Sequence, residues 1–229
     1  MNVADIRNHF IEALKNEEFT TDRDGSKTIE LIGASFVADE PSIFGTVNQD
    51  YVKAELDWYA SQSTNINDIE YGDCSKPPAA WVRTANMHGE INSNYGHLIN
   101  SAKYYSQEDH ALIELCNNPD SRRAAMIYTR PSIWVEYNEN DKNDFICTNA
   151  VTYYVRDNKM DCVVQMRSND VVFGYKNDYA WQKFVLDKMV SRYNHLTRKE
   201  TDRATVVPGT ITWQVQNLHV YSRHFNLVK

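Results

Sequence analysis

Apolar residues recur at helical spacing near the start of the chain and alternate with polar residues further along. Val3, Ile6, Phe10 and Leu14 lie three or four residues apart, so the spacing predicts a helix over residues 3 to 14. The runs TIELIGASFVA and MDCVVQMRS alternate in the way that half-buried strands do. Helical and strand patterns therefore interleave, and this predicts an α+β fold.

Two further core helices are expected from apolar stripes, one with Trp181, Val185 and Met189 and one with Leu112, Leu115 and Cys116. Residues 61–78 are polar and contain glycine and two prolines, so we expect a loop there. The chain has 229 residues, of which 42% are hydrophobic, and shows no internal repeat. This length suits one well-buried domain over residues 1–229.

A hairpin pattern surrounds the sequence RDNK, which separates the β-rich arms AVTYYV and MDCVVQM. Cys147 lies just ahead of the first arm, and the second arm ends in QMRSND. If the arms pair, Arg167 and Ser168 fold back beside Cys147. A cation at that place would lower the pKa of a thiol, as a nucleophile requires, or would hold a phosphate. The alternative interpretation of Cys147 is a buried filler, because free cysteine is among the most buried residue types.

Composition excludes several classes of function. The formal charge is −7, whereas broad binding to nucleic acid needs clustered lysine and arginine, so any phosphate contact must be local. No apolar run is long enough to cross a membrane and the acidic N-terminal segment does not resemble a signal peptide, which predicts a cytoplasmic protein. The four cysteines contain no CxxC pair, so we expect reduced thiols. HGE at residues 88–90 lacks the PCxxC that a zinc deaminase needs, and HExxH, Walker and GxGxxG motifs are absent, so no metal is expected.

Several blocks in fixed order carry a family resemblance. NPDSRR, DFICTN, QMRSNDVVFGYKNDYAW and LHVYSRH follow one another as they do in the thymidylate synthase superfamily, and DRDGSKT, ELDWY and GEINSNYG extend the match over nearly the whole chain. The chain looks most similar to the phage deoxycytidylate (dCMP) hydroxymethylases. The resemblance implies a mixed β-sheet packed with helices, a homodimer formed through the sheet, and 5,10-methylenetetrahydrofolate as co-substrate. It also implies work in the cytoplasm of an infected cell, with other phage nucleotide-synthesis enzymes as further partners.

The resemblance also implies roles for single residues. Cys147 would attack C6 of the pyrimidine, and Glu55 would organise the proton transfers and the water. The nucleotide would be held by Arg23, Arg167, Ser168, His219 and Tyr221, with Arg122 and Arg123 reaching across from the second subunit. Trp81 and Asp170 would contact the folate. The spacing of the residues alone favours other interpretations. Arg122 and Arg123 would be solvated side chains at a helix end. His219 would be a structural histidine, and Glu55 would be a solvated glutamate on a helix.

The implied chemistry explains why a cysteine is needed. C5 of an unactivated pyrimidine is a poor nucleophile, and thiolate addition at C6 makes it reactive toward the one-carbon unit. Water then adds to the resulting methylene group to give hydroxymethyl, whereas hydride from the folate would give methyl.

Asp178 is the residue expected to select cytosine over uracil. Thymidylate synthases have an asparagine here, which pairs with uracil, whereas a carboxyl group accepts from N4–H of cytosine and shares a proton with N3. Unpaired buried groups cost about 1 to 3 kcal/mol each, so the wrong base would be rejected strongly. Asp178 is also placed to cap the helix that follows.

Three functions remain open from the sequence. The first is a dCMP hydroxymethylase, which Asp178 favours, and the second is a thymidylate synthase or dUMP hydroxymethylase. The third is a non-catalytic nucleotide-binding subunit of a nucleotide-synthesis complex. This third hypothesis comes from the sequence ending at Lys229, because members of the resembled family continue into a tail that closes over the folate.

Overall fold

The computed structural model describes residues 1–72, 77–198 and 204–229. Cys74 lies outside the described residues. The α-helices are α1 (Val3–Lys15), α2 (Gln49–Ser61), α3 (Ala79–Val82), α4 (Tyr95–Asn100), α5 (Gln107–Asn117), α6 (Ile133–Glu136) and α7 (Gly174–Thr197). The strands are β1 (Thr20–Thr21), β2 (Lys27–Val37), β3 (Ala125–Ile127), β4 (Thr148–Arg156), β5 (Lys159–Asp170) and β6 (Val207–Tyr221). Short 3₁₀ turns are η1 (Ile66–Asp68), η2 (Ala102–Tyr104), η3 (Glu139–Asp141) and η4 (Ser222–Leu227).

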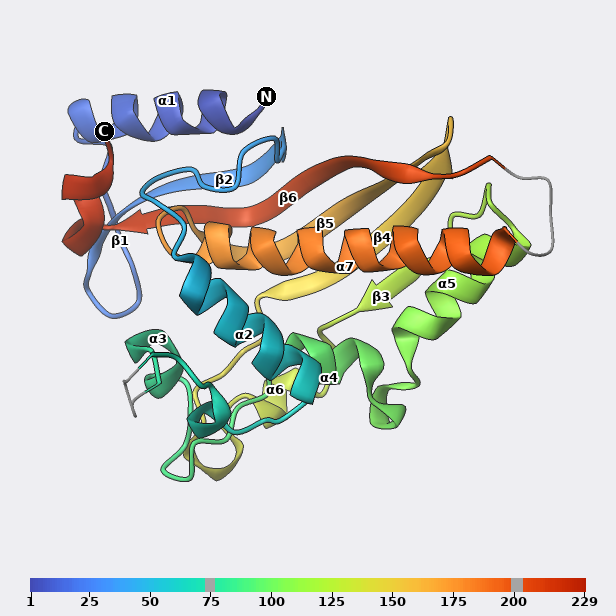
Figure 1. Cartoon of the computed structure of the whole chain (residues 1–229). Helices are drawn as coiled ribbons and strands as arrows, with labels where there is room; N and C mark the ends of the chain where they lie inside the picture. The colour runs from blue at the N-terminus through green and yellow to red at the C-terminus, as the bar shows by residue number, and fades with distance from the viewer. Residues whose placement is uncertain (73–76, 199–203) are drawn as a thin grey trace.

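The strands form one six-stranded mixed sheet in the order β1-β2-β6-β5-β4-β3. Four neighbouring pairs are antiparallel, and β5 and β6 are parallel, joined through α7. Figure 1 shows α7 running along one face of the sheet and α1 lying against β2. The predicted α+β class with a mixed sheet packed by helices is confirmed.

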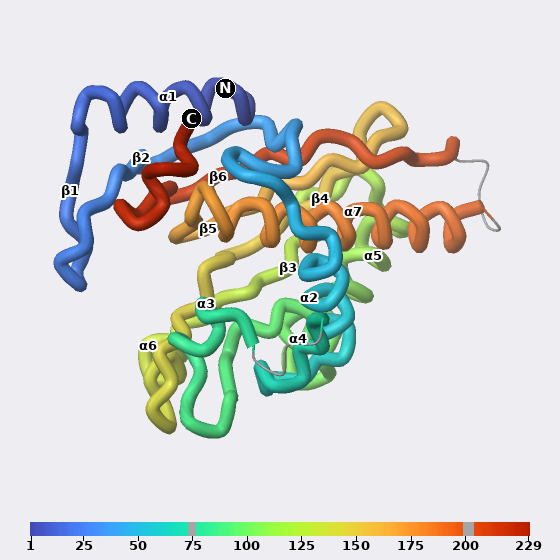
Figure 2. Tube along the Cα trace, turned by 60° about the vertical axis from the view of Figure 1, so that its left-hand side comes forward, coloured from blue at the N-terminus to red at the C-terminus, as the bar shows by residue number. Residues whose placement is uncertain are grey.

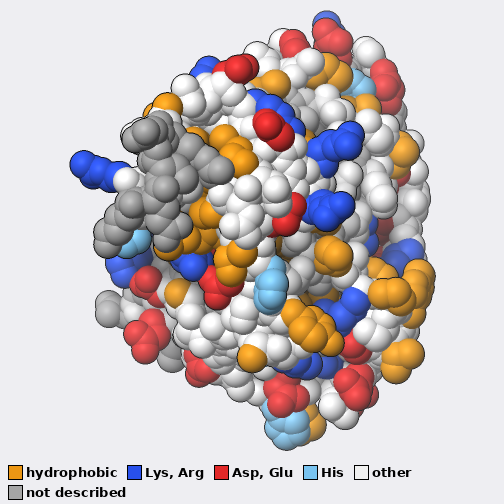
Figure 3. Space-filling view, turned by 90° about the vertical axis from the view of Figure 1, so that its right-hand side faces the viewer, with side chains coloured by type: hydrophobic (Ala, Val, Ile, Leu, Met, Phe, Trp, Pro, Cys, Tyr) orange, Lys and Arg blue, Asp and Glu red, His pale blue; other side chains and the backbone are white. Residues whose placement is uncertain are grey.

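A second group of elements lies beyond the sheet edge that β3 forms. Figure 2 shows α2, α3, α4 and α6 gathered there, away from α1. One apolar core nevertheless draws on residues from Val3 to Val228. The single domain over residues 1–229 stays a prediction. On the face shown in Figure 3, basic and acidic side chains of the described residues are interspersed, in keeping with phosphate contacts that are local.

The predicted hairpin between β4 and β5 is confirmed, and its turn explains its register. Asp157 and Asn158 have φ angles of 49° and 57°, the left-handed pair of a two-residue type I′ turn. Because this turn pairs Arg156 with Lys159, the ladder pairs Ala150 with Gln165, and a bulge between Thr148 and Ala150 then shifts the register by one residue, so that Thr148 pairs with Met166. The next residues on either side are Cys147 and Arg167, which therefore come together.

The start of α7 differs from the sequence expectation. Asp178 lies inside the helix, so its assignment as the helix N-cap is wrong. Oδ1 of Asp170 serves this end instead, because it accepts from the backbone N–H groups of Val172 (2.9 Å) and Phe173 (2.6 Å) in the turn ahead of α7 and from that of Gly174 (3.4 Å), the first helical residue. Asp178 is thereby one turn further along, with its side chain available for other contacts.

Candidate active site

Cys147 stands on the segment between α6 and β4, half-buried, with Arg167 beside it. One guanidinium nitrogen of Arg167 is 3.5 Å from Sγ, and the backbone N–H of Arg167 donates to the carbonyl of Cys147 at 2.9 Å. Arg167 Nε also donates to the carbonyl of Ile146 at 3.0 Å, and the guanidinium lies 4.8 Å from the ring centre of Phe145. The expectation that the hairpin brings Arg167 beside Cys147 is confirmed.

Burial governs the protonation of Cys147. Burial raises the pKa of the thiol to about 11, Arg167 opposes this shift, and the carboxyls of Asp178 and Asp144 add to it. The free protein therefore holds a thiol at neutral pH. Since the thiolate is the nucleophile, deprotonation has to accompany substrate binding.

Glu55 lies on α2 with only 5% of its surface exposed. Its Oε1 accepts from the hydroxyl of Tyr51 at 2.7 Å and from the indole N–H of Trp81 at 3.1 Å. Burial raises the pKa of Glu55 to about 7, while these two hydrogen bonds lower it. A carboxyl with this pKa can give and take protons near neutral pH, as general acid–base catalysis requires.

Asp178 on α7 is held by a chain of two hydrogen bonds. Its Oδ2 accepts from Asn169 Nδ2 at 2.7 Å, and Asn169 Oδ1 accepts from Trp213 Nε1 at 3.3 Å. Burial raises the pKa of Asp178 to about 8, and the charge of Glu55 adds to the shift. At pH 7 this carboxyl carries a proton. Because indole is only a donor, the amide of Asn169 has to turn its NH₂ toward Asp178, so Oδ2 is an acceptor in this contact.

The parallel pairing of β5 and β6 places Asp170 opposite His219. His219 is buried, and burial lowers its pKa while the charge of Asp170 opposes that shift. Its ring meets Tyr221 edge-on at 4.9 Å between ring centres. Oδ1 of Asp170 caps α7, and its Oδ2 is buried without a hydrogen-bond partner among the described residues. Ser168 pairs with Asn217 in this ladder, next to Arg167 in sequence.

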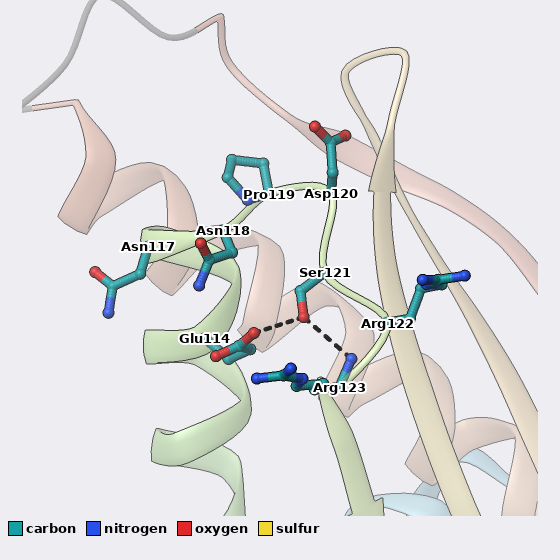
Figure 4. Close-up of a pocket in the computed structure, with 8 residues that line it drawn as sticks. All are labelled: Glu114, Asn117, Asn118, Pro119, Asp120, Ser121, Arg122 and Arg123. Atoms are coloured by element: carbon teal, nitrogen blue, oxygen red, sulfur yellow. Dashed lines mark hydrogen bonds between the residues drawn. The ribbon is translucent and has the colours of Figure 1, made fainter.

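The other three arginines of the predicted site lie in loops outside the β4–β5 hairpin. Arg23 is exposed in the turn between β1 and β2, close to the end of β6 because Thr28 pairs with Tyr221. Arg122 and Arg123 are exposed in the loop from α5 to β3, where they line a pocket of about 520 Å³. Figure 4 shows Arg123 turned toward Glu114 on α5 and Arg122 turned away.

Register fixes how far Arg123 is from the thiol. Ala125 pairs with Thr152, so Arg123 lies level with Tyr154, seven residues along β4 from Cys147. At about 3.3 Å per residue this is roughly 23 Å. Arg123 therefore does not reach the Cys147 of its own chain.

Three residues that the sequence analysis missed join the cluster. Tyr51 holds Glu55, Asn169 holds Asp178, and Tyr95 on α4 is buried and lowers the pKa of Asp178. Tyr51 had a detectable signal, because it precedes Glu55 by four residues on one helix face. Asn169 and Tyr95 had none, since their contacts depend on how separate elements pack.

A cysteine beside an arginine, with two buried carboxyls of raised pKa close by, is typical of an enzyme that acts through a covalent thiol adduct. The family model described as Thymidylate synthase matches residues 7–229. The deoxycytidylate 5-hydroxymethyltransferases of Enterobacteria phages T4 and T2 are each 54% identical to this chain over 228 residues, which is 100% of the chain and 89% of each relative. The thymidylate synthase of Fusobacterium nucleatum is 28% identical over 175 residues, 75% of the chain and 56% of that protein. The chain belongs to the thymidylate synthase family.

Two further findings concern only the described residues. They contain no cluster of three or more histidine, cysteine or acidic side chains placed to hold a metal ion. None of their helices is both long and apolar enough to cross a membrane.

Proposed function

We propose that this chain is a deoxycytidylate 5-hydroxymethyltransferase that transfers a one-carbon unit from 5,10-methylenetetrahydrofolate to C5 of dCMP. The observation that carries the proposal is the hydrogen bond from Asn169 that holds the buried carboxyl of Asp178, whose pKa is raised, within the cluster around Cys147. The full-length similarity to the phage T4 and T2 enzymes supports the same substrate.

Recognition of cytosine follows from the two oxygens of Asp178. Oδ2 is an acceptor because Asn169 donates to it, so it suits the N4–H of cytosine. Oδ1 carries the proton and suits N3. Uracil presents the opposite pattern, an acceptor at O4 and a donor at N3, and would leave both sides mismatched.

The reaction begins when the Cys147 thiolate bonds to C6. The electron pair of the C5–C6 double bond shifts toward N3, which takes the proton from Asp178, and C5 becomes nucleophilic. C5 then bonds to the carbon of the one-carbon donor as one of the two bonds from that carbon to nitrogen breaks. The C5 proton passes to the departing folate nitrogen as the second of these bonds breaks, which releases tetrahydrofolate and leaves a methylene group on C5. The folate is not oxidised.

Water completes the reaction at this methylene group. Its oxygen forms the new C–O bond, one of its protons passes to Glu55, N3 returns its proton to Asp178, and the C6–S bond breaks to return the thiolate to Cys147. The pKa of about 7 suits Glu55 to accept that proton.

Asp170 and Trp81 fit a folate beside this site. The buried Oδ2 of Asp170 lacks a hydrogen-bond partner among the described residues and would accept from the N–H groups of a pterin. Trp81 presents an aromatic surface and touches Glu55 through its indole N–H.

The phosphate site is proposed to need two subunits. Arg167, Ser168, His219, Tyr221 and Arg23 would come from one chain and Arg122 with Arg123 from its partner, since Arg123 lies roughly 23 Å from its own Cys147 by the β4 register. The face of the sheet that carries Gln165 and Gln214, joined at 3.2 Å, would be the dimer contact. Guanidinium groups suit phosphate because they bind it bidentately.

Mixed dimers test the shared site. The Cys147→Ala chain and an Arg122→Ala, Arg123→Ala chain are each expected to be inactive alone. Mixed after reversible dissociation, they are expected to regain roughly a quarter of wild-type activity, because half of the dimers are mixed and each has one complete site. Lack of recovery despite proven exchange of subunits would place the arginines outside the partner's site.

Product identity tests the proposed function. After incubation with methylenetetrahydrofolate and either dCMP or dUMP, mass spectrometry is expected to show hydroxymethylated dCMP, with no dihydrofolate formed. Methylated dUMP accompanied by dihydrofolate would show a thymidylate synthase, and hydroxymethylated dUMP a dUMP hydroxymethylase. Binding of dCMP without turnover would favour a non-catalytic subunit. Work in the cytoplasm of an infected cell and association with other nucleotide-synthesis enzymes stay predictions.

A further inference from the structure

Tyr51, Glu55 and Trp81 form a closed triangle of hydrogen bonds between α2 and α3. The indole N–H of Trp81 lies 3.1 Å from the hydroxyl of Tyr51 and 3.1 Å from Oε1 of Glu55. The hydroxyl of Tyr51 is 2.7 Å from the same Oε1. Indole can only donate, so the Tyr51 oxygen accepts from Trp81 and the Tyr51 proton has to point at Glu55.

This direction makes the two oxygens of Glu55 unequal. Oε1 accepts from both Tyr51 and Trp81, whereas Oε2 accepts no hydrogen bond from the described residues. A proton arriving at Glu55 would therefore bind at Oε2. The carboxylate also cannot rotate without breaking two hydrogen bonds in a buried setting, where lost bonds are costly.

We propose that Tyr51 is a positioning residue that fixes Oε1 of Glu55 as an acceptor and so reserves Oε2 for the water that adds to the methylene group. The inference rests on the proposed function. It assigns to Tyr51 a part in the hydration step and none in holding the nucleotide. Tyr51 acts through Glu55, and Trp81 sets the direction of its hydroxyl.

The groups around Glu55 define the expected pH dependence. Tyr51 and Tyr59 face it from its own helix, Asp178 faces it from α7, and the neutral indole of Trp81 faces it from α3. The hydrogen bond from Tyr51 stabilises the carboxylate and lowers the pKa of Glu55. Without this bond the pKa rises, and Glu55 holds a proton up to a higher pH. The acid limb of the kcat profile then moves to higher pH.

Tyr51→Phe tests the inference, because it removes the hydroxyl and keeps the ring. We expect kcat for hydroxymethylation to fall about 10- to 100-fold at neutral pH, the cost of one hydrogen bond to a charged group. The deficit should shrink as pH rises, and the KM for dCMP should change little. A tyrosine with only a structural role would lower the melting temperature and would not move the pH limb.

Tyr71→Phe is the matched control. Its ring meets Tyr51 edge-on at 5.4 Å between ring centres, and its hydroxyl accepts from Asn48 at 2.6 Å rather than touching Glu55. We expect this variant to keep the wild-type profile. An unchanged pH limb in Tyr51→Phe, with wild type and Tyr71→Phe active, would overturn the inference alone. Lack of hydroxymethylated dCMP from the wild type would instead overturn the proposed function.

Discussion

Cys147→Ala is expected to abolish hydroxymethylation of dCMP, with a loss of at least about 10⁴-fold in kcat. The thiolate is the group that bonds to C6, and neither Arg167 nor Glu55 can replace it. Formation of product, measured by mass, should fall below detection. Binding of dCMP, measured by calorimetry, should stay within about threefold of wild type, because the phosphate and sugar contacts come from other residues.

Cys162→Ala is the control for this loss. Cys162 is fully buried in β5, and burial holds its pKa far above neutral, to about 12. Its loss should lower stability while kcat remains near that of the wild type, since it lies in the core. If Cys147→Ala kept activity and Cys162→Ala lost it, Cys147 would not be the nucleophile.

Local sequence signals were sufficient to predict contacts within the hairpin, where the chain folds back on the preceding strand. RDNK specifies a tight turn, and the turn sets the hairpin register to within one residue of the Cys147–Arg167 pairing, which a bulge between Thr148 and Ala150 completes. The contact could therefore be predicted without knowledge of any relative. The same local logic failed at Asp178, because two acidic residues stand near the start of α7 and sequence does not say which one caps it. Asp170 lies closer to this end, since the end of β5 aims its carboxylate at the N–H groups of the turn ahead of the helix and of Gly174, the first helical residue.

Contacts between segments that are distant in sequence could not be predicted from the sequence. Trp81 reaches Glu55 from another helix, and Asn169 meets Trp213 across the sheet. No spacing rule links such pairs, which depend on how elements pack. The roles of Arg122 and Arg123 came only from family resemblance, and the β4 register now gives a physical reason to look for them in a partner's site.

Asn169 determines what a substitution at Asp178 will do. In Asp178→Asn, the amide cannot give N3 of cytosine the proton that thiolate addition requires. It pairs with uracil when its NH₂ takes the place of Oδ2, toward O4, and its oxygen takes the place of Oδ1, toward N3–H. Asn169 then has to turn its own oxygen toward residue 178 and give up the hydrogen bond from Trp213. The preference for a base should therefore shift toward uracil at the cost of that one contact.

Asp178→Asn is accordingly expected to lower the dCMP/dUMP ratio of kcat/KM by about 10²- to 10⁴-fold, since two buried hydrogen bonds at about 1 to 3 kcal/mol each change sides. In the wild type, activity on dCMP should fall as pH rises through about 8, where Asp178 loses the proton that N3 needs, and the variant should lack this limb. Asp144→Asn is the control, because Asp144 is also a buried carboxyl and binds Ser93 instead of Asn169. Equal ratios in wild type and Asp178→Asn would show that Asp178 does not select the base, whereas a fall confined to this variant assigns the choice of cytosine to its carboxyl group.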